Sequence, residues 1–357
     1  MFTSRFISDV RLAAHVSFRR AGGRSFGMTL FLCIPAAAVL LTAVCLGQEA
    51  LTSKPQPQTL TGTRLITLGT SGGPLPVKDR TQSSNLLIVN GVLYLIDAGD
   101  NVTRRIVQSS CDFRKVDKVF ITHAHSDHTL GLATLMGAAW EFQRSGPMDI
   151  YGPPGIRKLV DGAVDYLSVN AEIRSAEGKP YPLTGLFRAH ELPPGVIFHD
   201  NNVNVIAVEN THFHFPSGSR PFGKHKSYSY RFETSDRIIV FTGDSGPSDA
   251  LISLAKGADV LVTEVVVVND VLEVLERNGS WKAKTAESRN RGLFHMREEH
   301  MTPEQVGSMA AKAGVKTLVM SHLPPTVNPK EDYQRYVEAA KKYFSGRIIV
   351  ARDLSEF

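Results

Sequence analysis

The chain has few cysteines for its length: three among 357 residues, at Cys33, Cys45 and Cys111. The first two lie in an N-terminal segment that we expect to be separate from the folded body. The body therefore keeps Cys111 alone, and one cysteine cannot form an internal disulfide. We interpret Cys111 as structural or incidental rather than as a nucleophile. The body must therefore be held together without an internal disulfide, chiefly by its hydrophobic core.

The body also lacks an excess of charge of either sign. The whole chain has 40 basic and 35 acidic residues and a formal net charge of +5. Residues 1–47 contain five arginines and one acid, so removing them leaves a net charge of about +1. A near-neutral body has no broad positive field of the kind that binds nucleic acid phosphates. A net charge this close to zero is still compatible with a local basic patch.

Residues 1–47 have the features of a targeting segment. Arginines precede an apolar run over residues 28–47, and polar residues follow it. Cleavage after Gly47 would place the small residues Cys45 and Gly47 at the two positions that define a cleavage site. The run is also long enough to stay as a membrane anchor. We expect an exported protein, periplasmic or secreted, or one anchored to the membrane by residues 28–47.

Residues 48–62, rich in Pro, Gln, Thr and Ser, are predicted to be a linker to one folded domain over 63–357. Strand patterns in that domain fall into two blocks with helical patterns interleaved in each, and there is no internal repeat. A turn at Asn90-Gly91 joins the first clear pair of strands. Two sheets packed together and covered by helices on the outside would explain this order. The charged stretch 270–299 is predicted to be a surface excursion near the functional site, and the loops 170–200 and 213–226 are expected to shape the pocket with it.

The densest group of metal-binding side chains lies between residues 119 and 131. His123, His125, Asp127 and His128 follow a short apolar strand within six positions. On extended backbone, two histidines at a spacing of two can point the same way and hold one ion. Asp127 and His128, at the start of the next helix, can reach a second ion. Imidazole and carboxylate ligands without thiolate suit zinc, and manganese or iron could occupy such a site.

In this segment the chain resembles the metallo-β-lactamase superfamily, whose His-x-His-x-Asp-His motif is matched at every position. The similarity extends from about Leu68 to His322. It implies an α/β fold, a four-layer αββα sandwich, and two divalent metal ions. Asp97 matches the acidic residue that the family uses to brace the metal loop.

The resemblance supplies the remaining ligands. For the single histidine of the next family position, we prefer His212 over His214, because His212 follows most closely on an apolar strand. Asp244 matches the bridging carboxylate, and His322 matches the final histidine. The implied sets are His123, His125 and His212 for one ion, Asp127, His128 and His322 for the other, and Asp244 for both.

Several features resemble the ribonuclease Z and arylsulfatase branch of the superfamily. The glycine loop Leu68–Pro74, with Arg80, is similar to that branch's opening loop. Glu264 and His300 match its second acidic residue and its proton-transferring histidine, and Thr302 would cap the following helix. The candidate catalytic residues are therefore Asp127, Glu264 and His300.

The sequence thus predicts a metal-dependent hydrolase that acts on ester bonds through a hydroxide bound by two metals. The preferred substrate is a small ester: a phosphodiester, a sulfate ester or a lactone. The alternative is a ribonuclease Z-like endonuclease that acts on RNA. We favour the small ester because the body is neutral, export would separate the enzyme from RNA, and no segment matches the glycine- and proline-rich arm that clamps tRNA. A non-catalytic metal-binding protein would need a missing ligand, and none is missing. For the oligomeric state, the sequence is compatible with a monomer and with a homodimer.

Overall fold

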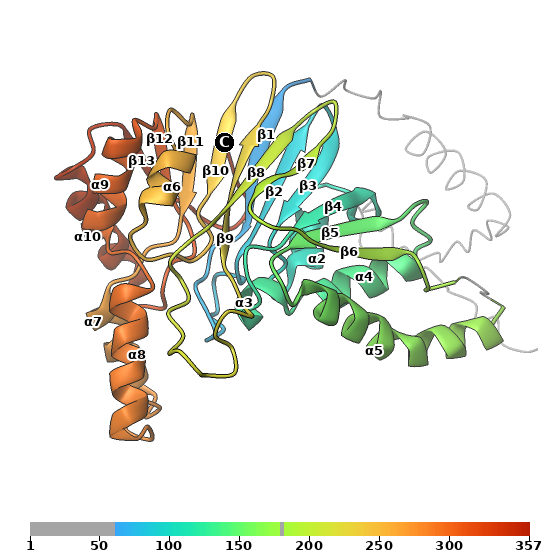
Figure 1. Ribbon diagram of the computed structural model, residues 1–357, viewed down its shortest axis with the longest axis horizontal. Coiled ribbons are helices and arrows are strands. Elements are labelled where there is room, and N and C mark those ends of the chain that lie inside the picture. The colour runs from blue at the N-terminus through green and yellow to red at the C-terminus, as the bar shows by residue number, and fades with distance from the viewer. Residues whose placement is uncertain (1–60, 179–181) are drawn as a thin grey trace, which may run out of the picture. The chain divides into compact units, whose positions relative to one another are not determined.

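The computed structural model describes residues 61–178 and 182–357, in which two seven-stranded sheets form the centre of the fold (Figure 1). Thr59–Phe357 make one compact unit. The predicted targeting segment, residues 1–47, lies outside the described residues, as does most of the predicted linker. Among the described residues, no helix has the length and apolarity that a membrane span requires.

The first sheet contains the strands of the N-terminal half and one strand from the C-terminus. Its order is β14-β1-β2-β3-β4-β5-β6. The strands are β1 (Thr63–Gly69), β2 (Ser84–Val89), β3 (Val92–Ile96), β4 (Val116–Phe120), β5 (Met148–Gly152), β6 (Phe187–Glu191) and β14 (Ser355–Glu356). Antiparallel β2 and β3 are joined at Asn90 and Gly91, which both have left-handed backbone, φ 49° and 82°. The predicted hairpin is confirmed, because such a turn requires positive φ at both positions.

The second sheet contains the later strands in the order β13-β12-β11-β10-β9-β8-β7. They are β7 (Gly195–His199), β8 (Asn204–Glu209), β9 (Tyr228–Glu233), β10 (Ile238–Phe241), β11 (Val260–Thr263), β12 (Thr317–Met320) and β13 (Arg347–Val350). From β10 to β13 the strands are parallel, and these connections carry helices. Parallel strands need such crossovers, so both faces of this part of the sheet are covered.

Helices cover the outer face of each sheet, which gives four layers. The helices are α2 (Val102–Gln108), α3 (Ser126–Thr129), α4 (Leu132–Glu141), α5 (Ile156–Ala176), α6 (Asp249–Leu254), α7 (Val268–Arg277), α8 (Ala286–Glu298), α9 (Pro303–Ala313) and α10 (Pro329–Lys341), with a 3-10 turn η1 (Phe113–Lys115). One apolar cluster joins α2, α4 and α5 to the first sheet, and another joins α6, α9 and α10 to the second. A third cluster fills the space between the sheets. The predicted αββα sandwich is confirmed.

Alternation along single strands explains why both faces of a sheet are buried. In β2, Leu86 and Ile88 belong to the outer cluster under the helices, whereas Leu87 and Val89 belong to the cluster between the sheets. Successive side chains of a strand point to opposite faces. An uninterrupted apolar run is therefore the pattern expected of a strand that is buried on both sides.

Two regions differ from the expectations. The stretch 170–200, expected to be loop, contains the end of α5 and the strands β6 and β7. These are the edge strands of the two sheets, and Phe187 and Ile197 are among their few buried apolar side chains. Edge strands carry a weaker hydrophobic signal because one side lacks a neighbour. The surface excursion 270–299 is largely helical, since it contains most of α7 and all of α8, which together project beyond the sheets (Figure 1).

Candidate metal centre

The predicted ligands come from loops that follow strands of both sheets. His123 and His125 follow β4, and Asp127 and His128 lie on the short helix α3. The other three ligands follow strands of the second sheet: His212 after β8, Asp244 after β10 and His322 after β12. The sandwich therefore brings residues from positions 123 to 322 to one end of the sheets.

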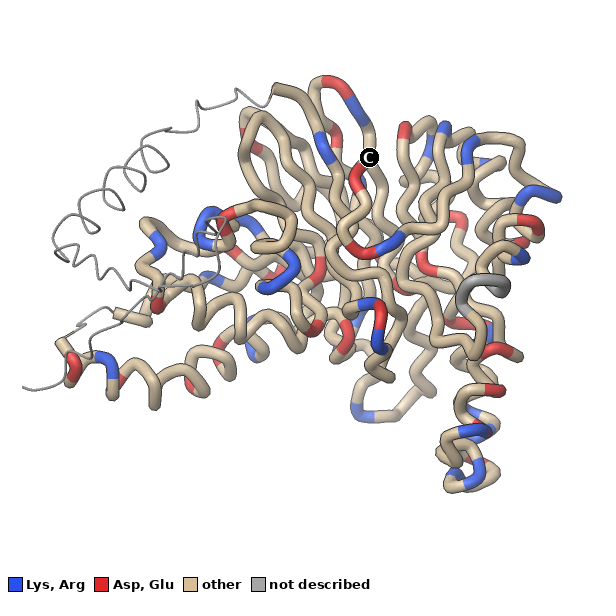
Figure 2. Tube along the Cα trace, turned by 180° about the vertical axis from the view of Figure 1, so that it is seen from behind, with Lys and Arg blue, Asp and Glu red and all other residues tan. Residues whose placement is uncertain are grey.

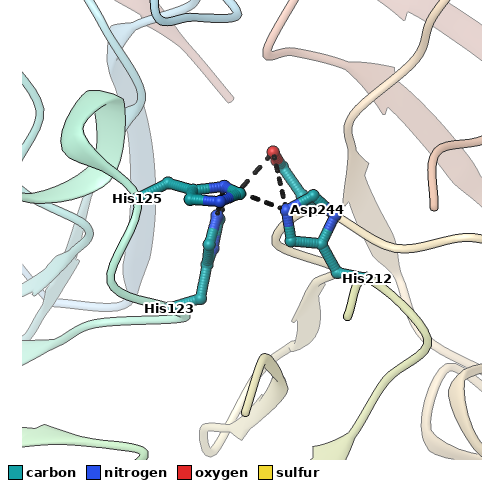
Figure 3. A group of neighbouring side chains, drawn as sticks. All are labelled: His123, His125, His212 and Asp244. Carbon is teal, nitrogen blue, oxygen red and sulfur yellow. Dashed lines mark hydrogen bonds and ion pairs between the residues drawn. The ribbon is translucent and has the colours of Figure 1, made fainter. Parts of the chain in front are cut away.

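The first group of ligands is formed by His123, His125, His212 and Asp244 (Figure 3). His125 Nδ1 lies 3.1 Å from His123 Nε2 and 3.1 Å from His212 Nε2. Asp244 Oδ2 lies 3.9 Å from both Nε2 atoms. Two ligands that are each about 2.1 Å from a tetrahedral ion are about 3.4 Å apart. The four atoms therefore surround a point where one divalent ion fits.

The second group is formed by Asp127, His128, His322 and again Asp244. His322 Nε2 lies 3.2 Å from Asp127 Oδ2 and 3.3 Å from Asp244 Oδ1. His128 Nε2 lies 3.6 Å and 3.4 Å from the same two oxygens. One Asp244 oxygen thus faces each group, which is the arrangement of a carboxylate that bridges two ions.

Two buried polar atoms of this centre support the assignment. Among the described residues, His128 Nε2 and Asp244 Oδ1 are buried without a hydrogen-bond partner. Burying a polar group without a partner is costly, so native structures rarely leave one unsatisfied. Both atoms point into the second group, where an ion would satisfy them. The donor set of imidazole nitrogens and carboxylate oxygens fits divalent ions of the first transition row.

The carboxylates of Asp127 and Asp244 favour positive charge at the second group. Burial lowers the pKa of His128 and of His322, but Asp244, followed by the other neighbouring carboxylates, raises both above the ordinary value for histidine. A divalent ion is attracted by the same carboxylates and competes with these protons. We therefore expect ion binding at this group to release protons.

The histidines of the first group are held neutral, as ligands must be. Burial lowers the pKa of His125 to about 4 and holds the pKa of His123 and His212 well below the ordinary value. A neutral imidazole keeps a lone pair for a metal ion. His212 donates from Nδ1 to the backbone carbonyl of Glu299 at 2.9 Å, which leaves Nε2 for the ion.

His212, and not His214, points into the first group. His212 is fully buried, whereas the side chain of His214 is 45% exposed and lies 3.7 Å from a carboxylate oxygen of Glu299. The two residues are two positions apart but have different surroundings, because the chain leaves the extended conformation after Glu209. The preferred choice of His212 therefore agrees with the geometry.

The hydrogen bonds of Asp97 match the bracing role that the resemblance implies. His128 donates from Nδ1 to Asp97 Oδ2 at 2.8 Å, which leaves Nε2 free for an ion. Thr122 donates to Asp97 from its backbone nitrogen at 2.7 Å and from its hydroxyl at 2.9 Å. Contacts of this kind behind the ligands fix the orientation of each imidazole.

An Asp97→Asn variant is expected to bind metal about 10- to 100-fold more weakly, because the amide loses the charge that favours the required form of His128. Metal affinity measured by competition with a chromogenic chelator would give this value. Asp353 accepts from the backbone nitrogens of Thr70 and Thr81 behind the glycine loop, so Asp353→Asn is a matched control for a buried structural aspartate. Equal metal affinities of Asp97→Asn and wild type would contradict the orienting role of Asp97.

The glycine loop lies against the second group. Gly73 donates from its backbone nitrogen to Asp127 Oδ2 at 2.9 Å. A Cβ at Gly73 would come within 2.2 Å of the Asp127 side chain. Arg80 stabilises the loop by donating to the Thr70 hydroxyl and to the backbone carbonyl of Ala351. Glycine is required here because the backbone approaches a ligand so closely.

Glu264 and His300 lie together beside the two groups. His300 Nδ1 is 3.1 Å from Glu264 Oε2, and the backbone nitrogen of Met301 donates to Glu264 Oε1 at 2.8 Å. Burial lowers the pKa of His300, but the charge and hydrogen bond of Glu264, together with the charges of Asp244 and Asp127, raise it to about 9. Thr302 caps α9 as predicted, with Gln305 completing a capping box that holds the turn before the helix in place.

Two residues of this region were not predicted. His295, on α8, has its Nε2 3.3 Å from His300 Nε2, and the two form a third cluster with His212. The Glu299 carboxylate accepts from His295, Arg291 and the backbone nitrogen of His214. Burial raises the pKa of Glu299, but hydrogen bonds from His295 and Arg291 lower it to about 2. The sequence offered a hint, because both residues lie within five positions of His300.

The comparisons with known proteins agree with this arrangement. A family model described as a beta-lactamase superfamily domain matches residues 93–323. Ribonuclease Z of Mycobacterium bovis is 27% identical over 292 residues, which cover 81% of this chain and 96% of that protein. Ribonuclease Z of Methanosarcina mazei is 25% identical over 319 residues, which cover 82% and 97%.

Solved structures share the fold at lower identity. The metallo-beta-lactamase fold protein YhfI from Bacillus subtilis has a TM-score of 0.59 at 19% identity, covering 83% of this chain and 98% of that one. Human tRNase Z, short form, has a TM-score of 0.55 at 21% identity, covering 82% and 98%. Zinc-bound PqqB from Methylobacterium extorquens has a TM-score of 0.55 at 17% identity, covering 82% and 99%.

Proposed function

Because the chain belongs to the beta-lactamase superfamily and is a hydrolase, we propose that it is a metal-dependent phosphodiesterase of the ribonuclease Z type. Its substrate is RNA or another nucleotide-containing phosphodiester. The observation that carries the proposal is the bridging position of Asp244, with one carboxylate oxygen toward each group of ligands. Sites with two ions in this arrangement serve displacements at phosphorus, where attacking and leaving oxygens both need stabilisation.

Zinc is the ion that we propose for both groups. The first group would hold one ion through His123, His125 and His212, and the second would hold the other through Asp127, His128 and His322, with Asp244 common to both. When bound, the two ions supply a water of lowered pKa and neutralise the charge that develops on the phosphate oxygens. The zinc in the structurally similar PqqB supports this choice.

The protein itself supplies the proton for the leaving group. We assign this role to His300, whose Nδ1 is held by Glu264 so that Nε2 lies on the side of His295 and the ligands. A histidine of raised pKa is protonated at neutral pH and can donate to the departing ribose oxygen. Asp127 accepts a hydrogen bond from the backbone nitrogen of Gly73, which ties the second group of ligands to the glycine loop.

The relatives favour RNA over the small ester that the sequence alone led us to prefer. They are ribonucleases, and they match over four-fifths of this chain. The argument from net charge was weak, because a body that is neutral in sum can still concentrate basic residues beside its active site. The segment 210–227 does so, with Arg220, Lys224 and Lys226 and no acidic residue.

Export remains part of the proposal. Its basis is the arginine-rich and apolar segment 1–47, which lies outside the described residues. An exported enzyme of this type would act on RNA or nucleotide phosphodiesters outside the cytoplasm. Fractionation of cells that express the full chain, followed by determination of the N-terminus, would test this placement: a protein that begins at Met1 in the cytoplasmic fraction contradicts it.

The experiment for the activity uses the zinc-loaded full chain on matched nitrophenyl substrates: a phosphodiester, a sulfate ester and a lactone. We expect kcat/KM for the phosphodiester to exceed the other two values by at least about 10²-fold, because the relatives are ribonucleases, which cleave phosphodiesters, and two-ion sites stabilise both oxygens of such a displacement. Single-stranded RNA is the next substrate, with chelator-treated protein as the control. Dominant turnover of the sulfate or the lactone would overturn the proposal.

A further inference from the structure

A groove of about 690 Å³ opens beside the metal centre. Its walls are the connection between β8 and β9, residues 210–227, and the helix α8, which lie side by side (Figure 1). Phe213 joins the groove to the centre: its ring centroid lies 5.2 Å from that of His125 and 4.9 Å from that of His212. We call this feature the aromatic groove. A ligand in it would be continuous with the point where the bond is cleaved.

The walls of the aromatic groove carry four phenylalanines. Phe213 and Phe215 are stacked, with ring centroids 4.9 Å apart and planes 28° from parallel. Phe222 and Phe294 are exposed, at 53% and 41%. Among the described residues, Phe142 is the only other phenylalanine in the exposed class, so two of three lie here. Exposed aromatic rings gathered in a groove mark a surface that binds a ligand.

Basic side chains accompany the rings. The Arg291 guanidinium lies over the Phe294 ring, 4.9 Å from its centroid, and pairs with Glu299 at 2.6 Å. Lys226, on the opposite wall, pairs with Glu209 at 2.6 Å. The Glu299 carboxylate also makes a hydrogen bond with His295 Nδ1.

The tip of the 210–227 connection adds Arg220 and Lys224, which are both exposed. Basic residues on this connection and on α8 are coloured blue along the chain trace (Figure 2). Flat aromatic faces together with cations fit a ligand that combines aromatic rings with negative charge. A nucleotide has both, because its base stacks and its phosphate is anionic.

We propose that the aromatic groove binds an unpaired base next to the phosphodiester that is cleaved at the metal centre. The base stacks on the phenylalanines, and Arg291 and the basic residues of the 210–227 connection contact neighbouring phosphates. A base inside a duplex has both faces covered by its neighbours, so the ligand is a single strand or a free end. This inference rests on the proposed phosphodiesterase function and defines its substrate more narrowly.

The test compares a dinucleoside monophosphate with two abasic analogues, each with one base replaced by hydrogen. Stacking of one base on aromatic side chains contributes about 10- to 100-fold in affinity. We expect the zinc-loaded chain to prefer the intact dinucleotide over one of the analogues by this factor in kcat/KM, mainly through KM. Phe294→Ala should lower that preference about tenfold, through a loss of kcat/KM on the intact dinucleotide. Phe294→Tyr should restore it.

Phe142→Ala is the control, since Phe142 is also exposed but contacts Phe113 rather than the groove. Two results would contradict base binding in the aromatic groove: equal kcat/KM for intact and abasic substrates, or a Phe294→Ala defect of the same size on both. Neither result would contradict the proposed phosphodiesterase activity.

A binding measurement tests the aromatic groove independently of the proposed phosphodiesterase activity. The fluorescence anisotropy of a labelled oligonucleotide, intact or abasic, is followed with chelator-treated chain, which cannot turn it over. Tighter binding of the intact strand that Phe294→Ala removes supports the groove even if zinc-loaded protein cleaves nothing. Failure to distinguish the two strands overturns it.

Discussion

An Asp244→Ala variant is expected to lose at least about 10³-fold in kcat/KM on phosphodiesters and to purify with less zinc than wild type. Asp244 contacts both groups, with Oδ2 toward His123 and His212 and Oδ1 toward His128 and His322. Its removal takes a ligand from each ion. A bound ion contributes several kcal/mol of charge stabilisation in the transition state, and about 4 kcal/mol corresponds to about 10³-fold in rate.

Metal content by atomic emission and kcat/KM on the nitrophenyl phosphodiester are measured on the same preparations. The exposed Asp161 of α5 provides the control. Asp161→Ala makes the same change from aspartate to alanine in a helix that contains none of the candidate ligands. Chelator-treated wild type should fall to the level of Asp244→Ala and recover when zinc is returned. Near-normal turnover by the variant or by metal-free protein would exclude the two groups as the reaction centre.

The second large effect is expected at His300. A His300→Ala variant should lose about 10²- to 10⁴-fold in kcat on RNA while its zinc content stays unchanged, because His300 belongs to neither group that Asp244 bridges. Glu264→Gln should act in the same direction with a smaller loss, since it weakens the hold on His300 Nδ1. His190→Ala is the control: His190 also pairs with an aspartate, Asp149 at 2.8 Å, but on strand β6.

The leaving group distinguishes a proton donor from a structural support. A ribose oxygen must be protonated as it departs, whereas nitrophenolate is stable without a proton. The His300→Ala defect should therefore be large on RNA and small on the nitrophenyl phosphodiester. Equal defects on both substrates, or loss of zinc from the variant, would show that His300 supports the centre rather than donating a proton.

Much of the fold could be predicted because its signals are local. The apolar runs of β2 and β3 and the Asn90-Gly91 turn between them depend on neighbours in the sequence, and the structure reproduces them. The edge strands β6 and β7 were missed because their hydrogen bonds to one neighbour depend on partners elsewhere in the sheet. β6 has only five residues, and β7 has three apolar residues in succession instead of an alternation between apolar and polar.

The sequence by itself determined the chemistry of the centre. His123, His125, Asp127 and His128 are ligand types within six positions, and a spacing this short directs them to one place whatever surrounds them. Asp244 and His322 could be added because each follows an apolar strand in the order that the family shares. Ligand type and spacing therefore predicted a metal site at residues 123–128, and the resemblance to the family extended it to a site for two divalent ions.

The tertiary structure decided how that chemistry is used. His212 is held by the carbonyl of Glu299, 87 residues away, and no local pattern relates the two. The aromatic groove likewise forms only when the 210–227 connection meets α8, which brings Phe213 and Phe294 to one surface. Net charge hid this surface because it sums over the chain, whereas a ligand responds to the charges within about 10 Å of it. Short sequence spacing thus predicted the four candidate ligands of residues 123–128, and the family resemblance supplied the other three. The proposed recognition of substrate depends on contacts between distant segments.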